Sequence, residues 1–198
     1  RSLAPFVEAM PAPALPARGP ARRVAGYTVY PLPYESPNHA ATVPPADGRS
    51  AVADPSDPTA SPFGWHDTNG AAGAEYTHTW GNNVRAYSDR AADNTGTLAD
   101  SPDGTASLTF DFPLDLTQAP SAYTDAAVTN LFYWTNIVHD VMYQYGFDEA
   151  AGNFQVNNYG NGGADGDDVR AEAQDGSGLN AANMFTPPDG AQPRLQMF

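Results

Sequence analysis

Histidines are the residues of this chain best suited to bind zinc, and there are four: His39, His66, His78 and His139. The commonest zinc hydrolases place two histidines one helical turn apart with a glutamate between them, in the pattern HExxH. Only His139 falls in a helical pattern, and four positions further on stands Tyr143. We therefore predict that these residues form no zinc site, and we interpret His139 as a packed helix histidine.

The chain also lacks the residues that several other kinds of catalytic or binding site require. Because the chain has no cysteine, it has no disulfide, no thiolate-bound metal and no cysteine nucleophile. The GxSxG pattern of serine hydrolases is absent. The glycine-rich stretch 160–168 lacks the lysine of a phosphate loop. Its carboxylates, Asp165, Asp167 and Asp168, are weak calcium candidates because oxygen ligands suit a hard cation, and the alternative is a solvated acidic loop.

Charge and composition exclude some partners. The chain carries nine basic and 23 acidic side chains, a net charge of −14. Nucleic acids and anionic membranes require a basic surface, so we expect neither as a partner. No apolar run approaches the roughly 20 residues of a membrane span. The 18 glycines and 19 prolines predict long loops, and the 41% hydrophobic content is sufficient for a folded core.

One long helix is predicted over about 123–145, followed by Gly146. Apolar side chains at intervals of three, four and seven form one stripe, which other apolar residues widen, so we expect a helix buried on most sides. The stripe is Val128, Leu131, Val138, Met142 and Tyr145, widened by Ala127, Trp134 and Val141.

Short alternating patterns predict several strands, which makes the fold class α+β. The first 25 residues, rich in proline and alanine, indicate a linker, and 31–62 indicate an irregular stretch. Residues 75–87 predict a hairpin that turns at Gly81 and Asn82. Further strands are predicted over 26–30, 107–112, 153–159, 169–173, 180–185 and 194–198.

Several longer motifs resemble one known family. From Asn130 the chain reads NLFYWTNIVHDVMYQYGFDEAAGNFQVNNYG and continues to NAANMFTPPDG at Gly190. Upstream it reads ASPFGWH over 60–66 and WGNNVRAY over 80–87. Over roughly 24–198 these motifs closely resemble, in the same order, the bacterial branch of the fungalysin family (peptidase family M36), secreted zinc metallopeptidases also called extracellular elastinolytic metallopeptidases.

The resemblance implies a β-rich N-terminal subdomain of a thermolysin-like metallopeptidase, with one long buried helix. Family members carry HExxH a few tens of residues beyond the point where this chain stops, so the zinc ligands and catalytic glutamate are expected outside it. No catalytic residue is therefore expected within it. The ending at Leu195–Phe198, within an apolar strand pattern, also suggests a truncation.

By the same resemblance, an edge strand of this subdomain binds extended peptide substrates through its main chain. The matching segment is 180–185, with Asn180, Ala181, Ala182, Asn183 and Met184 as the substrate-binding residues. Fungalysins usually read NNANFA here, and Ala181 replaces the second asparagine. The alternative is an edge strand with no ligand.

The resemblance further implies a secreted zymogen. Residues 1–25 would be a propeptide tail or a linker, and the partners would be a peptide substrate, the protein's own propeptide and its own C-terminal zinc-binding subdomain. Zinc is the expected cofactor of the whole enzyme. Two other interpretations stay open: a non-catalytic β module that binds peptides or a partner, and one half of a nicked enzyme.

Overall fold

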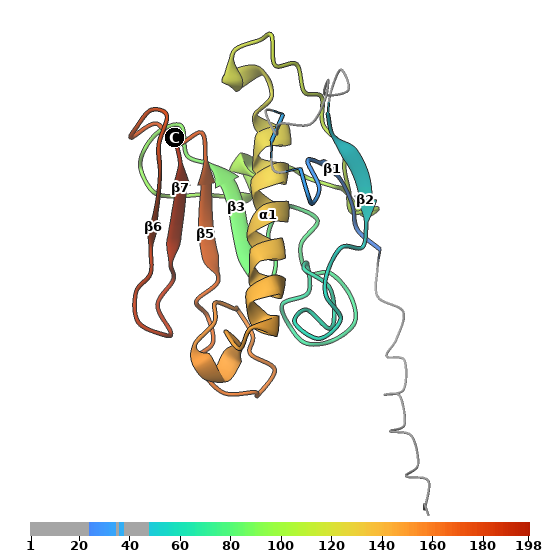
Figure 1. Ribbon diagram of the computed structural model, residues 1–198, viewed down its shortest axis with the longest axis vertical. Coiled ribbons are helices and arrows are strands. Elements are labelled where there is room, and N and C mark those ends of the chain that lie inside the picture. Colours follow the sequence, from blue (N-terminus) through green and yellow to red (C-terminus); the bar gives the residue numbers. More distant parts are fainter. Residues whose placement is uncertain (1–23, 35, 38–47) are drawn as a thin grey trace, which may run out of the picture.

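The computed structural model describes residues 24–34, 36–37 and 48–198. His39 and nearly all of the predicted linker over 1–25 lie outside these residues. One long helix stands between two small sheets, so the α+β class is confirmed (Figure 1). The described strands are β1 (Gly26–Val29), β2 (Ser50–Ala53), β3 (Val84–Ser88), β4 (Thr109–Phe110), β5 (Val169–Ala173), β6 (Ala182–Phe185) and β7 (Arg194–Met197).

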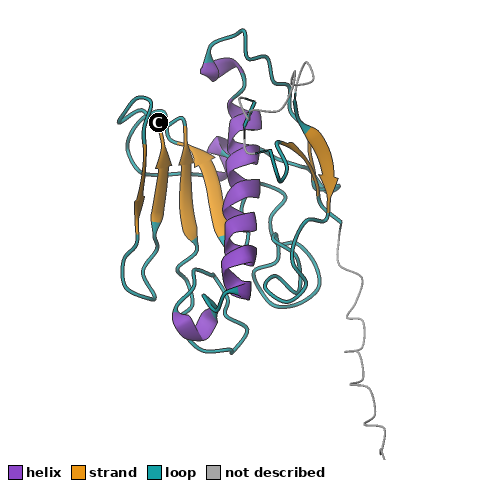
Figure 2. Ribbon diagram, viewed as in Figure 1, coloured by secondary structure: helices purple, strands orange, loops and turns teal. Residues whose placement is uncertain are grey.

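The helix α1 spans Thr124–Gln144, close to the predicted bounds, and runs beside the full length of the strands of the larger sheet (Figure 2). It contacts β1 on one side and β3 and β5 on the other. The main core lies at these contacts and is rich in aromatic rings. Tyr27 of β1 stacks on Phe110 with ring centroids 5.2 Å apart, and Phe132 of α1 packs beside Tyr27.

The face that α1 buries differs from the apolar stripe predicted for it. Val138, Met142 and Tyr145 of that stripe are 54%, 45% and 84% exposed. The prediction of burial on most sides is therefore wrong for the C-terminal half of the helix. The prediction considered apolar residues alone, whereas the buried face of α1 also carries polar side chains. The buried residues are Ala126, Val128, Thr129, Phe132, Tyr133, Asn136 and Asp140.

Asp140 is buried because it satisfies donors from a distant loop. Its Oδ2 accepts from the backbone amide of Asp57 and from the indole of Trp65, both at 2.9 Å. Its Oδ1 accepts from the hydroxyl of Ser61 at 2.7 Å. A charged acceptor strengthens each of these hydrogen bonds. The helix thereby fixes residues 57–65, which contain no regular strand or helix.

The same contacts continue to β3. Asn83, immediately before β3, donates from its amide to Ser61 Oγ and to Asn136 Oδ1, both at 3.1 Å. Asn136 in turn donates to the carbonyl of Phe132. We call Asp57, Ser61, Trp65, Asn83, Asn136 and Asp140 the Asp140 network. It joins a loop, a helix and a strand that are distant in sequence.

The larger sheet has the strand order β3-β5-β7-β6. The first three strands are parallel, and β6 runs antiparallel beside β7 at the edge. Strands β5, β6 and β7 confirm the patterns predicted over 169–173, 180–185 and 194–198. The smaller sheet has the order β2-β1-β4. The irregular stretch predicted over 31–62 missed β2, and the described residues 153–159 form no strand.

The predicted hairpin over 75–87 forms only in part. A bridge between Trp80 and Arg85 closes the turn, but only the second arm is a strand. The first arm has two partners: Thr79 accepts from the amide of Ala86 in β3 and donates to the carbonyl of Pro102, and Gly104 donates to the carbonyl of Thr77. The local pairing is therefore short, and β3 pairs with β5 along its whole length.

Replacing Asp140 by alanine is expected to lower the free energy of unfolding by about 3 kcal/mol or more, because it leaves buried donors of Asp57, Ser61 and Trp65 unpaired. The matched control is Asp125→Ala, an exposed carboxylate in the first turn of the same helix, which should cost less than about 1 kcal/mol. Chemical denaturation of the 198-residue chain measures both. Equal losses for the two variants would contradict the role given to the network.

Candidate functional site

The segment predicted to bind substrate lies at the open edge of the larger sheet. Strand β6 takes up Ala182–Phe185, with Asn180 and Ala181 immediately before it. All four strand residues are exposed, and β6 is the outermost strand (Figure 1). An unpaired strand edge can accept another extended chain by main-chain hydrogen bonding. The edge therefore has the geometry required for strand addition.

The hydrogen-bond pattern shows which main-chain groups of β6 face outward. Phe198 donates from its amide to the carbonyl of Ala181, so this pair lies at a hydrogen-bonded position of the antiparallel ladder. In such ladders, bonded and non-bonded residue pairs alternate. The N–H and C=O groups of Ala182 and Met184 therefore point away from β7. These two residues carry the free donors and acceptors of the edge.

An apolar groove of about 420 Å³ lies beside this edge. Its floor comes from the sheet and its wall from the exposed side of α1. Met184 of β6 lines it together with Leu195, its partner on β7. Because side chains alternate along a strand, Asn183 and Phe185 point to the opposite face. The apolar lining is Val84, Leu131, Trp134, Val138, Met142, Phe147, Phe154, Val169, Met184, Leu195 and Met197.

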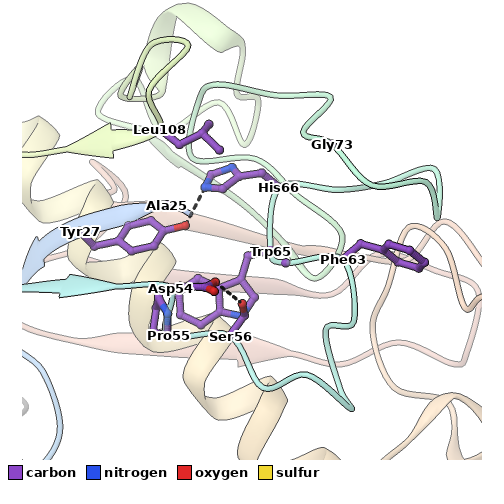
Figure 3. Close-up of a pocket in the computed structure, with 11 residues that line it drawn as sticks. Ala25, Tyr27, Asp54, Pro55, Ser56, Phe63, Trp65, His66, Gly73 and Leu108 are labelled. Atoms are coloured by element: carbon purple, nitrogen blue, oxygen red, sulfur yellow. Dashed lines mark hydrogen bonds between the residues drawn. The ribbon is translucent and has the colours of Figure 1, made fainter. Parts of the chain in front are cut away.

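His66 lies in the core with both ring nitrogens occupied. Nδ1 donates to the carbonyl of Trp80 at 3.0 Å, since a carbonyl only accepts. Nε2 therefore accepts from the hydroxyl of Tyr27 at 2.7 Å (Figure 3). The ring also stacks on Phe110, with centroids 5.1 Å apart. Burial lowers the pKa of His66 to about 4. The cavity beside it is about 10 Å³, too small for a substrate.

The other two described histidines also have local partners. His139 Nδ1 lies 3.0 Å from Asp140 Oδ1, and its Nε2 lies 3.3 Å from the side-chain amide of Asn153. The Nδ1 atom of His78 lies 3.4 Å from the hydroxyl of Thr77, and the His78 backbone forms a β-bridge with Asp103. Within the described parts of the chain, no cluster of three His, Asp or Glu side chains close enough to hold a metal ion includes a histidine.

The three calcium candidates in the glycine-rich loop point to different protein donors. Asp168 forms a bidentate ion pair with Arg85, at 2.6 and 2.8 Å. Asp167 accepts from the amides of Gln155 and Gly190, and burial raises its pKa. Asp165 accepts from the amide of Asn158. Calcium at this loop stays a prediction.

Sequence reasoning missed the structural use of these aspartates. Both Asp167 and Asp168 are fully buried, whereas acidic residues among glycines are usually solvated. The one signal in the sequence was Arg85, a basic residue within the alternating pattern of β3, with which the buried Asp168 pairs.

Among the described residues, no helix is both long and apolar enough to cross a membrane.

Comparison with known proteins gives one family. The sequence model of the family described as Fungalysin metallopeptidase (M36) matches residues 26–198. Extracellular metalloproteinase MEP from Leptosphaeria maculans is 40% identical over 175 residues, and its namesake from Pyricularia oryzae is 41% identical over 175. Both alignments cover 88% of this chain and 26% of the relative.

A third relative is Extracellular metalloproteinase 2 from Trichophyton rubrum, which is 44% identical over 140 residues. That alignment covers 71% of this chain and 22% of the relative. The chain thus spans about a quarter of the length of the curated relatives it matches.

The buried His66 predicts a specific dependence of stability on pH. Its folded pKa lies below the unfolded value of 6.5, so between pH 6.5 and about 4 the unfolded chain binds more protons than the folded one. Stability from this group is present above pH 6.5 and is lost as the pH falls. The free energy of unfolding should fall relative to that of His66→Gln, by up to about 1.4 kcal/mol per pH unit.

Denaturation curves of both proteins at pH 7, 6 and 5 measure this difference. Burial raises the pKa of the neighbouring Asp67 to about 6, which acts in the opposite direction. Because Asp67 is present in both proteins, its contribution cancels in the difference. A difference that stays constant with pH would contradict the neutral, buried ring.

Proposed function

Because this chain belongs to the fungalysin metallopeptidase family (M36), we propose that residues 26–198 are the β-rich N-terminal subdomain of a secreted zinc-dependent endopeptidase. In this role the chain supplies scaffold and the substrate-binding edge strand. Three of the relatives are named extracellular metalloproteinases, which supports a secreted hydrolase of peptide bonds. The substrate is an extended peptide or protein.

The observation that carries the proposal is the open edge of β6. Ala182 and Met184 offer outward main-chain groups, so a peptide can add as a further strand. Met184 also lines the apolar groove, which places a side-chain pocket next to the main-chain contacts. Asn180, Ala181, Ala182, Asn183 and Met184 are the proposed binding residues. With Ala181 in place of asparagine, the main chain supplies most of the affinity.

The apolar groove supports a second part of the proposal, a contact with the remainder of the parent protein. An uncovered apolar surface of this kind marks an interaction site. The matched relatives are about four times longer than their alignments with this chain. We propose that the protein's own C-terminal zinc-binding subdomain covers the groove. Its own propeptide is a further proposed partner, with residues 1–25 as the propeptide tail or a linker.

The described histidines do not suit a zinc site, because the ring nitrogens of His66 and His139 are engaged by protein groups and no acidic cluster includes them. We therefore propose that zinc is bound by residues outside this chain. In metallopeptidases the metal activates a water molecule for attack on the peptide bond. This chain contributes binding and orientation of the peptide, and we assign it no catalytic residue.

Two alternatives follow from the same edge strand. A non-catalytic β module would bind peptides or a partner chain without hydrolysis. One half of a nicked enzyme would become active when a second polypeptide supplies the zinc helix. In both, β6 keeps its role in binding. The first alternative has no hydrolysis, and in the second a separate polypeptide supplies the zinc ligands.

Peptide hydrolysis and zinc content, measured on the 198-residue chain and on the full-length protein, separate these possibilities. We expect hydrolysis and one bound zinc in the full-length protein only. Zinc or hydrolysis in the 198-residue chain would contradict the proposal. A full-length protein with neither would favour the non-catalytic module.

The edge strand has its own test in the full-length protein. Ala182→Pro removes an outward N–H without removing a bond to β7, so we expect KM for peptides to rise about tenfold or more, equivalent to about 1.4 kcal/mol, with little change in the melting temperature. Asn183→Pro removes an inward N–H and is the control that should lower the melting temperature. An unchanged KM in the folded Ala182→Pro protein would contradict strand addition at β6.

A further inference from the structure

Three carboxylates meet on the face of the larger sheet opposite α1. Asp89 directly follows β3, Glu172 lies within β5, and Asp175 follows β5 by two residues. Their exposed fractions are 2%, 0% and 2%. Each offers an oxygen that lies within 4.8 Å of the others. They come from the carboxyl ends of neighbouring parallel strands, where side chains from separate loops converge.

One oxygen of this cluster has no protein donor. Oε1 of Glu172 accepts from the hydroxyl of Tyr87 at 2.8 Å, whereas Oε2 is buried without a donor among the described residues, and the Glu172 side chain interacts with the carboxyl group of Asp175, itself an acceptor. Burying a carboxylate oxygen without a donor costs free energy. A cation at this point would provide the missing interaction.

The protein supplies too little positive charge for three carboxylates. Arg194 Nε lies 3.3 Å from Glu172 Oε1. Arg170, on the same strand as Glu172, forms no ion pair within the described part of the chain. Even with the guanidiniums of both Arg194 and Arg170 counted, three ionised carboxylates leave an excess of negative charge. Burial raises the pKa of Glu172, and the adjacent carboxyl groups of Asp175 and Asp89 act in the same direction.

The surrounding groups hold the carboxylates in place. Asp89 accepts from the amides of Asp93 and Asn94 at 3.1 and 2.8 Å, which leaves further lone pairs on both oxygens. Asp175 Oδ1 accepts from Ser177. The loop after β3 also packs on Tyr87, where a Cβ on Gly96 would come within 2.3 Å of the ring, and this contact holds the hydroxyl that donates to Glu172.

We propose that Asp89, Glu172 and Asp175 bind a divalent cation, Ca²⁺, which neutralises the excess negative charge of the cluster. The ligands are oxygens only, which suits a hard cation and not a soft one. Calcium–oxygen distances of about 2.3–2.6 Å let one ion reach oxygens separated by up to about 4.8 Å. All three ligands lie in this chain, so the site is independent of the proposed peptidase activity.

Thermal unfolding of the 198-residue chain, first treated with a chelator, tests the proposal. At pH 7.5, millimolar Ca²⁺ should raise the melting temperature by about 5 °C, as expected when the ligand exceeds its Kd about 100-fold. The same concentration of Mg²⁺ should raise it less, because Mg²⁺ requires shorter and more regular coordination. A melting temperature that does not respond to Ca²⁺ would overturn the proposal.

Three isosteric variants locate the site. Glu172→Gln and Asp89→Asn should each abolish the response to Ca²⁺, since each removes one charged ligand. Asp165→Asn, in the glycine-rich loop, is the matched control and should keep the response. A response that persists in the first two variants, or is lost in the third, would overturn the proposal.

Amide NMR signals of the unmodified chain give a second measurement that requires no variant to fold. On addition of Ca²⁺, the largest shifts should be those of Asp93, Asn94 and Ser177, whose amides donate to the proposed ligands. The largest shifts at Asn158 and Gly190 instead, around the glycine-rich loop, would overturn it.

Discussion

The carboxylate of Asp140 is the interaction on which most of the architecture depends. It lies on the buried side of α1 and accepts hydrogen bonds from Asp57, Ser61 and Trp65. Those residues belong to a stretch without regular backbone pairing, so side chains must satisfy its polar groups. Ser61 then reaches Asn83, and through it the start of β3. The position of the larger sheet thus follows from a polar contact inside the protein, in addition to apolar packing.

Local patterns were sufficient to predict the elements whose residues alternate or repeat. The helix, β1, β5, β6 and β7 were all predictable in this way. Local patterns gave wrong predictions where a segment distant in sequence determines which side chains are buried or which segments pair. Val138 and Met142 fit a buried stripe, but Asn136 and Asp140 occupy the interior because their partners come from residues 57–83. The first arm of the predicted hairpin is shared between β3 and residues 102–104, and the buried Asp168 pairs with Arg85 of the neighbouring strand β3.

The substrate-binding role of β6 was predicted from a family resemblance, but the direction of its main-chain groups could not be predicted from the sequence. Whether Ala182 or Asn183 directs its main chain outward depends on register with β7, which no periodicity of the segment itself fixes. The groove beside it combines residues from α1, β3, β5, β6 and β7, so its existence depends on the whole arrangement. Of the apolar residues wrongly predicted to be buried, Val138 and Met142 line this groove, whereas Tyr145 does not. The periodicity of the helix identified an apolar surface correctly, but it could not show that part of this surface lines a groove and is not buried in the core.

The Asp140 network also has a consequence for how this fold can be recombined. Its members come from three separate stretches of chain, around 57–65, at 83 and at 136–140. A chimera that takes residues 57–65 from one relative and the helix from another combines hydrogen-bond donors and acceptors from two different proteins, which need not match. Crossover points between 65 and 136 therefore divide a single hydrogen-bonded unit. Gene shuffling of this region should retain these segments together as one inherited block.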